Sequence, residues 1–240
     1  MKTIIHKAKD RGHANHGWLQ AYHSFSFANY FDPDKIQFGA LRVLNDDTIA
    51  PKMGFGTHPH DNMEIITIPL SGILKHRDNI HQDWQSVLPG EVQVMSAGTG
   101  VKHSEINGSD EESLSLFQIW IIPNKRNVAP QYSQKSFSPD VRKNTLQTLV
   151  TSVNNSDEGS LKIYQDAFLS RIDLGKGQSF DYQLRDRSHG VYVMIVSGDV
   201  VVANEKLKSR DALGISETDH FKIHASEASE VLFIEVPMHV

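Results

Sequence analysis

Two short pairs of side chains in the first half of the chain have the residue types of a metal centre. His58 and His60 are separated only by Pro59, and His103 and Glu105 repeat the same spacing. In an extended chain, residues two apart point to the same face, so each pair would present two ligands together. Pro59 fixes its own φ and biases His58 towards extended geometry. Two such pairs on neighbouring strands would bring four ligands to one point.

Three imidazoles and one carboxylate suit a divalent transition metal, and Fe(II), Mn, Ni, Co, Cu and Zn all accept such ligands. Four protein ligands on an octahedral ion leave two positions open, which is typical of a catalytic site rather than a structural one. The chain has no cysteine, which excludes disulfides, thiolate zinc sites and iron–sulfur clusters, and it has 13 histidines. The sequence therefore predicts one metal ion with nitrogen and oxygen ligands, against the alternative of surface or hydrogen-bonded histidines.

Acidic side chains outside the two pairs complicate the choice of oxygen ligand. Glu64 lies four residues after the second histidine, so strand alternation places it on the same face. Spacing alone does not decide between Glu64 and Glu105. The trio Asn45-Asp46-Asp47 is expected to cap a turn, which is a structural role rather than a catalytic one.

Other histidines lack ligand spacing. His13, His16 and His23 lie in a stretch rich in aromatic residues that could line or cap a pocket, although local packing is the favoured interpretation. His76 and His81 flank a predicted hairpin turn and are expected to be solvated.

The elements that must position these residues are strands. Apolar alternation and Gly or Pro punctuation dominate, and helical periodicity is scarce. The segment 114–122, LSLFQIWII, is apolar on both faces, so we expect it to lie between a barrel interior and a second packed layer. Many short strands predict an all-β barrel or sandwich. The predicted strands are residues 62–70, 73–77, 84–88, 91–96, 114–122, 161–164, 168–174, 180–184, 191–196, 200–202, 221–224 and 230–236.

A change in composition divides the chain into two halves. Residues 123–160 hold three prolines and the polar run SVNNSDEGS, and we interpret them as a connection between domains with some ordered structure of its own. We predict a metal-binding N-terminal domain over residues 1–130. We predict a second domain over residues 131–240, preceded by an inter-domain connection and without metal.

A faint internal repeat supports two related halves. A Ser-Gly turn between apolar strands occurs at residues 71–72 and again at 197–198. The offset between these turns places Leu184 and Asp186 opposite the first ligand pair. One register after the turn places His224 and Ser226 opposite the second pair. The second half has therefore lost the ligand set.

Bulk properties limit the partners. The net charge is −5 and no Lys/Arg run stands out, so direct nucleic-acid binding is not expected. No stretch has the length of a signal peptide's apolar segment or of a membrane span. The sequence predicts a cytoplasmic protein.

Four blocks of sequence carry a resemblance to a known family. FSFANYFDP at 25–33, LRVLNDD at 41–47, GFGTHPHDNMEI at 54–65 and VQVMSAGTGVKHSE at 92–105 together resemble the pirin family, most closely its bacterial quercetin 2,3-dioxygenases. The resemblance implies a bicupin, with two antiparallel β-barrels in tandem and metal only in the first. It assigns the ligands to His58, His60, His103 and Glu105, which leaves Glu64 as second choice. Family members typically carry iron.

The resemblance also implies an activity. A dioxygenase of this kind takes a small aromatic substrate and dioxygen, and cleaves a flavonol such as quercetin with release of carbon monoxide. Glu105 would be both metal ligand and base for the substrate hydroxyl. The alternative is a metal-binding regulator that acts through protein partners, since animal pirins resemble transcription cofactors. The acidic net charge favours protein contacts over DNA in that case.

Overall fold

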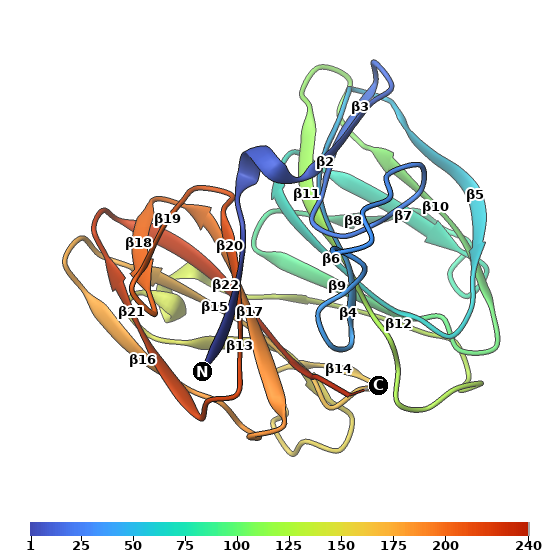
Figure 1. Cartoon of the computed structure of the whole chain (residues 1–240). Helices are drawn as coiled ribbons and strands as arrows, with labels where there is room; N and C mark the ends of the chain where they lie inside the picture. The colour runs from blue at the N-terminus through green and yellow to red at the C-terminus, as the bar shows by residue number, and fades with distance from the viewer. Residues whose placement is uncertain (240) are drawn as a thin grey trace.

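The computed structural model describes residues 1–239 and is built almost entirely from β-strands (Figure 1). Two single-turn 3-10 helices, η1 (Ala8–Asp10) and η2 (Pro139–Arg142), complete the regular structure of this part of the chain. Neither is long or apolar enough to cross a membrane, and the described residues contain no other helix. Figure 1 shows two bodies of strands side by side, so the all-β prediction is confirmed.

The first body combines a larger and a smaller antiparallel sheet. The larger sheet contains β2 (Gly12–Asn15), β3 (Leu19–His23), β4 (Leu41–Ile49), β6 (Glu64–Ser71), β9 (Glu91–Ser96), β11 (Leu114–Ile121) and β12 (Gln131–Ser136). The smaller contains β5 (Gly54–His60), β7 (Leu74–Asp78), β8 (Gln85–Val87) and β10 (Val101–Asn107). Their orders are β12-β9-β6-β11-β4-β3-β2 and β5-β10-β7-β8. The two sheets close around a barrel interior.

The second body repeats this plan. Its larger sheet contains β1 (Lys2–His6), β13 (Gln147–Ser152), β14 (Leu161–Ile163), β15 (Phe168–Leu174), β17 (His189–Ser197), β20 (Ala212–Ser216) and β22 (Ser229–Pro237). Its smaller sheet contains β16 (Ser179–Gln183), β18 (Asp199–Val202), β19 (Glu205–Lys208) and β21 (His220–Ala225). The orders are β1-β20-β17-β22-β15-β13-β14 and β16-β21-β18-β19. The fold is therefore two barrels in tandem, as the resemblance implied.

Every strand predicted from alternation is present, with ends that agree within two residues. The strands missing from that prediction include both polar and apolar segments. β4 contains Asn45, Asp46 and Asp47 in its middle, so the prediction that this trio caps a turn is wrong. Pairing with β3 and β11 on either side satisfies the β4 backbone, and this tertiary pairing overrides the local preference of Asn and Asp for turns.

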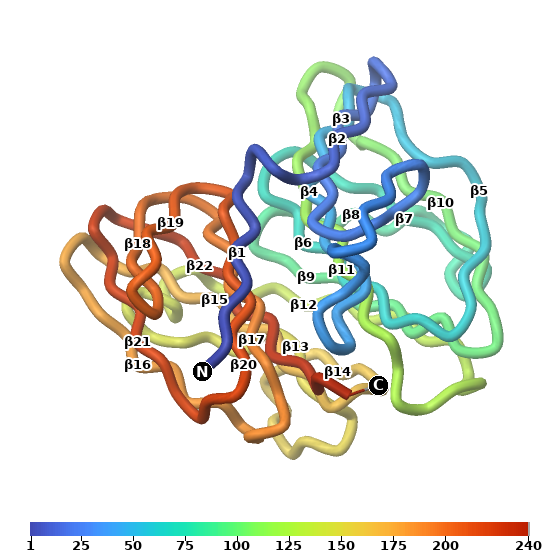
Figure 2. The backbone as a smooth tube through the Cα atoms, in the orientation of Figure 1, coloured from blue at the N-terminus to red at the C-terminus, as the bar shows by residue number. Residues whose placement is uncertain are grey.

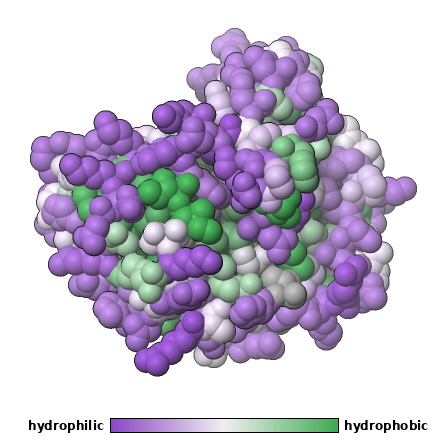
Figure 3. All heavy atoms as spheres, in the orientation of Figure 1, coloured by the Kyte–Doolittle hydropathy of each residue, from purple (hydrophilic) through white to green (hydrophobic). Residues whose placement is uncertain are grey.

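Two strands connect the barrels by lying outside their own half. β1 pairs with β20 of the second barrel, and the tube in Figure 2 runs along it there. β12, which begins at the predicted boundary between residues 130 and 131, pairs with β9 of the first barrel. The division into residues 1–130 and 131–240 stays a prediction, which would have to account for these two strands. Figure 3 shows an apolar area over β1 and β20, where Ile4 and Ile5 of β1 are partly exposed.

Strand β11 lies between two packed layers, as its two apolar faces predict. Phe117 and Ile119 belong to a core that also contains Leu232 and Ile234 of β22, in the other barrel. Gln118, between them, lines a cavity inside the first barrel. One face of β11 therefore joins the two halves, and the other helps to build a site.

Candidate metal centre and substrate cavity

Strands β5 and β10 bring the two predicted ligand pairs together. They are antiparallel neighbours, and His58 lies directly opposite His103. A register shift between His103 and Glu105 bends β10 at the site. The approach of the strands is so close that a Cβ at Gly54 would lie 2.2 Å from the carbonyl oxygen of Glu105. Glycine at this position therefore permits the pairing on which the site depends.

Three imidazoles converge on the wall of the barrel. The coordinating nitrogens of His58, His60 and His103 all lie within 4.8 Å of one another. The Nε2 atoms of His58 and His103 are 2.9 Å apart. Two imidazole nitrogens at right angles on one ion, each bound at about 2.1 Å, would lie about 3.0 Å apart. The spacing therefore fits a shared divalent cation.

The protonation of these imidazoles also fits a cation. Burial, followed by the neighbouring histidines, lowers the pKa of His103 far below its usual value. Burial and His58 lower the pKa of His60 to about 4. The Nδ1–H of His58 donates to the carbonyl oxygen of Gly56 at 2.8 Å, which leaves its Nε2 lone pair facing His103. At neutral pH the rings of His60 and His103 are therefore uncharged and able to bind a metal ion.

Glu105 lies beside this group and is 3% exposed. Its nearest metal-capable neighbours are His103 and His76, whose coordinating atoms form a second group within 4.8 Å. His103 is common to both groups, while His58 and His60 are outside the second. Glu105 Oε2 accepts from Gln118 Nε2 at 3.0 Å, and Oε1 has no partner in the described part of the chain. An unpartnered buried carboxylate oxygen is costly, and a bound cation would satisfy it.

Burial raises the pKa of Glu105 to about 7, although the hydrogen bond from Gln118 opposes this shift. Gln118 is itself oriented by Thr67, whose hydroxyl donates to Gln118 Oε1 at 2.8 Å. The Gln118 amide is therefore fixed as a donor towards Glu105. A carboxyl group with a pKa near neutrality can exchange a proton at physiological pH, which is the property of a general base.

Glu64, the competing carboxylate, lies elsewhere. It is 1% exposed, and its Oε2 accepts from Ser96 Oγ at 2.6 Å. It belongs to neither group of metal-capable side chains among residues 1–239. Strand β6, which carries Glu64, pairs with β9 and β11 in the larger sheet, whereas β5 belongs to the smaller one. Parity along the chain failed because the chain passes from one sheet to the other between His60 and Glu64.

His76 is the residue that sequence reasoning misplaced. It is fully buried, so the prediction that it is solvated is wrong. Its Nε2 lies 2.9 Å from Asp78 Oδ2, and its ring stacks on Tyr132 at 5.0 Å between centroids. The alternating burial of β7 places His76 and Asp78 on the inner face, and recognising that alternation could have identified it. His81, in the following loop, is largely exposed as expected.

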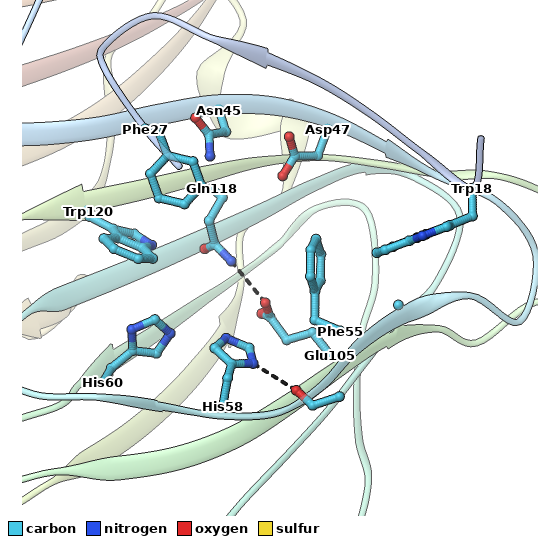
Figure 4. A pocket seen from close by; sticks show the side chains of 12 residues that line it. Trp18, Phe27, Asn45, Asp47, Phe55, His58, His60, Glu105, Gln118 and Trp120 are labelled. Atoms are coloured by element: carbon cyan, nitrogen blue, oxygen red, sulfur yellow. Dashed lines mark hydrogen bonds between the residues drawn. The ribbon is translucent and has the colours of Figure 1, made fainter. Parts of the chain in front are cut away.

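A cavity of about 450 Å³ opens beside the histidines (Figure 4). Two walls are aromatic. Figure 4 shows His58 and His60 on one side, with Asn45 and Asp47 on the opposite side pointing towards them. Glu105 and Gln118 lie between these sides. The aromatic side chains of the lining are Trp18, Phe27, Phe55 and Trp120.

Two tandem barrels with a histidine-rich cavity in the first define a bicupin. The family models agree: one described as Pirin matches residues 5–121, and one described as Quercetinase C-terminal cupin domain matches residues 149–236.

Related proteins cover nearly the whole chain. A quercetin 2,3-dioxygenase from Escherichia coli (strain K12) is 45% identical over 97% of this chain and 98% of its own length. A putative quercetin 2,3-dioxygenase from Pseudomonas aeruginosa is 42% identical over 94% of this chain and 95% of its own. The crystal structure of the bacterial pirin YhhW from Escherichia coli in complex with nickel(II) covers 100% of both chains, with a TM-score of 0.92 and 42% identity. The chain belongs to the pirin family. Within that family it is a cupin dioxygenase.

Proposed function

We propose that the protein is a metal-dependent dioxygenase that cleaves flavonols such as quercetin at one mononuclear centre. The proposal rests on one observation above all. Three imidazoles converge beside a buried carboxyl group, on the wall of an aromatic-lined cavity. The relatives named quercetin 2,3-dioxygenase support the choice of substrate.

The residues that would hold the ion are His58, His60, His103 and Glu105. A bound divalent metal would act as a Lewis acid and as a template for substrate and dioxygen. Iron(II) is the proposed ion, and the nickel complex of the related pirin supports a site that accepts several divalent metals. The Gly56 carbonyl fixes the tautomer of His58 and so keeps its ligand atom directed to the site.

Glu105 would accept the proton of the substrate's 3-hydroxyl. Burial raises the pKa of this carboxyl group, which makes its carboxylate a stronger base than that of an ordinary glutamate and suits it to accept this proton. Gln118 would hold the carboxylate in place during the transfer through its 3.0 Å hydrogen bond. Dioxygen then adds across the C2–C4 unit of the substrate, two carbon–carbon bonds break, and carbon monoxide leaves.

The cavity would bind a flat aromatic molecule between its rings. Trp18 and Phe55 lie 5.3 Å apart between centroids, and Phe27 and Trp120 also lie 5.3 Å apart, both in edge-to-face geometry. These pairs form rigid apolar walls and exclude water from the reacting atoms.

The experiment is metal analysis of protein purified without added ions, followed by oxygen uptake with quercetin. We expect about one divalent metal per chain and oxygen consumption that disappears after chelation and returns with added iron(II). A metal-loaded protein that consumes no oxygen with any flavonol would contradict the proposal. That result would favour the regulator that acts through protein partners, which metal-dependent pull-down would then test. The cytoplasmic location stays a prediction that cell fractionation checks.

A further inference from the structure

A second chamber adjoins the cavity described above. It has a volume of about 330 Å³ and shares with the first chamber the lining residues Trp18, Phe27, Asn45, Asp47 and Phe55. The rest of its lining comes mainly from the hairpin of β2 and β3 and from the segment that follows it. We name the first the metal-side chamber and the second the hairpin-side chamber. The two adjoin at the shared aromatic walls.

Asp47 is the unusual group at this junction. It lines both chambers and is 5% exposed. Its Oδ1 is buried without a hydrogen-bond partner among residues 1–239, and no ion pair to Asp47 is found there either. In Figure 4 its carboxyl group points into the metal-side chamber. Buried polar groups nearly always have a partner, so this one points to a ligand.

The neighbouring residue Asp46 shows that positively charged side chains are available near this part of β4, although none of them pairs with Asp47 in the described chain. Asp46, one position earlier on β4, points to the other side of the strand. There it contacts Arg11 at 3.3 Å and Arg210 at 3.0 Å. Alternation along β4 thus directs both arginines to Asp46 and leaves Asp47 facing the chambers unpaired.

Asn45 adds a second polar group on the same face. Its Oδ1 is 2.8 Å from His23 Nδ1. Burial lowers the pKa of His23, so the ring is neutral and its Nδ1–H donates to that oxygen. The amide nitrogen of Asn45 is thereby left as a donor towards the chambers, and no hydrogen bond from it is found within the described chain. Neither chamber has a lysine or arginine in its described lining.

We propose that the hairpin-side chamber binds a second, hydroxyl-bearing ring of the substrate, with Asp47 and Asn45 as hydrogen-bond partners of its hydroxyl groups. The inference rests on the proposed function, because the ring that reacts must lie at the histidines. It also narrows the substrate class. The ligand is an uncharged, planar aromatic molecule with a chelating hydroxyl–ketone unit at one end and phenolic hydroxyls at the other.

The chemistry of Asp47 suits a phenol. Burial, followed by the charges of Asp46 and Glu105, raises the pKa of Asp47 to about 8. A protonated carboxyl group both donates and accepts a hydrogen bond, as a phenolic hydroxyl does. An anionic substituent would find no lysine or arginine in the lining that the structure describes for either chamber, and would lie near the carboxyl groups of Asp47 and Glu105.

The experiment compares quercetin with 3-hydroxyflavone, which keeps the chelating unit but lacks the other hydroxyls. In Asp47→Leu we expect KM for quercetin to rise about tenfold, because its phenolic hydroxyl would lose a buried partner. KM for 3-hydroxyflavone should stay within about twofold or fall, and kcat should change little for either substrate. Asp47→Asn keeps a donor and an acceptor and should stay close to the unaltered protein with both substrates.

The matched control is Thr48→Val, the next residue of β4, whose side chain is exposed on the other face. It should change neither KM. If Asp47→Leu does not fold, Asp47→Ala gives the same comparison. Anaerobic binding of the two flavonols to the metal-loaded protein provides a readout independent of turnover, and the same selective loss is expected.

Two failures are distinguishable. If the unaltered protein neither binds nor converts either flavonol, the proposed function itself is wrong. If it converts both flavonols, but the Asp47 variants shift the two KM values equally or not at all, the proposed function stands. The hairpin-side chamber then does not bind the hydroxyl-bearing ring of the substrate.

Discussion

The two barrels share one strand order, but corresponding positions hold metal-capable side chains in the first barrel and apolar core residues in the second. The small sheet of the first has the order β5-β10-β7-β8, and that of the second has the order β16-β21-β18-β19. Leu74 pairs with Asn107 in the first, and Val200 pairs with Ala225 in the second. Leu74 and Val200 each lie two residues after the glycine of their Ser-Gly turn. Counting along the paired strands, the positions of His58, His60, His103 and Glu105 correspond to Tyr182, Leu184, Phe221 and Ile223.

All four residues of the second set are buried in one apolar core. Tyr182 stacks on Phe221 at 5.1 Å between centroids, where the first barrel has two imidazoles facing each other. The register suggested from the sequence, with His224 and Ser226 opposite the second ligand pair, is therefore wrong, and His224 is exposed. The stretch before the Ser-Gly turn is two residues longer in the second half, from 184 to 198 against 60 to 72. A single offset could not align both strands.

The two barrels also differ in how many hydrogen bonds a buried carboxyl group accepts. Glu235 of the second barrel is fully buried, yet it accepts hydrogen bonds from Tyr182 Oη at 2.8 Å and from the Arg185 backbone nitrogen at 2.7 Å. Burial alone would raise its pKa, but hydrogen bonds from His189, Tyr182 and Arg185 outweigh burial and lower it. Glu105 has one such bond and a raised pKa. Satisfied polar groups stabilise a fold, whereas unsatisfied ones leave capacity for a ligand.

The largest expected effect separates ligand histidines from structural ones. His103→Ala should abolish metal retention, with a loss of affinity of more than about 100-fold, because one ligand and the geometry it supports disappear. Metal content of the purified variant measures this. The control is His224→Ala in the second barrel, which removes an exposed histidine of β21 and should keep full metal. Full occupancy in His103→Ala would refute the ligand assignment.

The next effect separates the two buried glutamates of the first barrel. Glu105→Gln should lower kcat about 100-fold or more, because the base is lost while a neutral oxygen donor stays in place. Some metal should be retained. Glu64→Gln, the control, should change neither metal content nor turnover, since Glu64 contacts Ser96 away from the histidines. If Glu64→Gln is the variant that empties the site, the choice of carboxylate is wrong.

The sequence could predict the ligand candidates and many of the strands, because both are local patterns. It could not predict which sheet each strand joins. Glu64 and Glu105 became distinguishable only when β5 and β6 were found in different sheets. Asp47 appeared to belong to a turn, because the tertiary pairing that makes β4 a strand leaves no local signal. Features that depend on contacts between distant strands therefore needed the structure.

The last prediction uses the stability of the fold to compare two buried glutamates whose pKa values shift in opposite directions. Burial raises the pKa of Glu64 from 4.5 to about 7, so the folded state holds this proton more tightly than the unfolded state does. Stability from this group is therefore lost as pH rises from about 4.5 to about 7, by roughly 3 kcal/mol in total. Glu64→Gln removes the proton exchange, so its stability relative to the unaltered protein should rise across that window.

Glu235 should behave in the opposite way. Its folded pKa is lowered, so its contribution is present above the unfolded value of 4.5 and is lost as pH falls through the folded pKa. Glu235→Gln should therefore be most destabilising at neutral pH and less so in acid. Urea unfolding of both variants from about pH 3 to pH 8 measures the two slopes, since the Glu235 window lies below 4.5 and the Glu64 window above it. Slopes of the same sign would show that hydrogen bonding does not distinguish these carboxyl groups, and the contrast between the barrels would have to rest on the ligand positions alone.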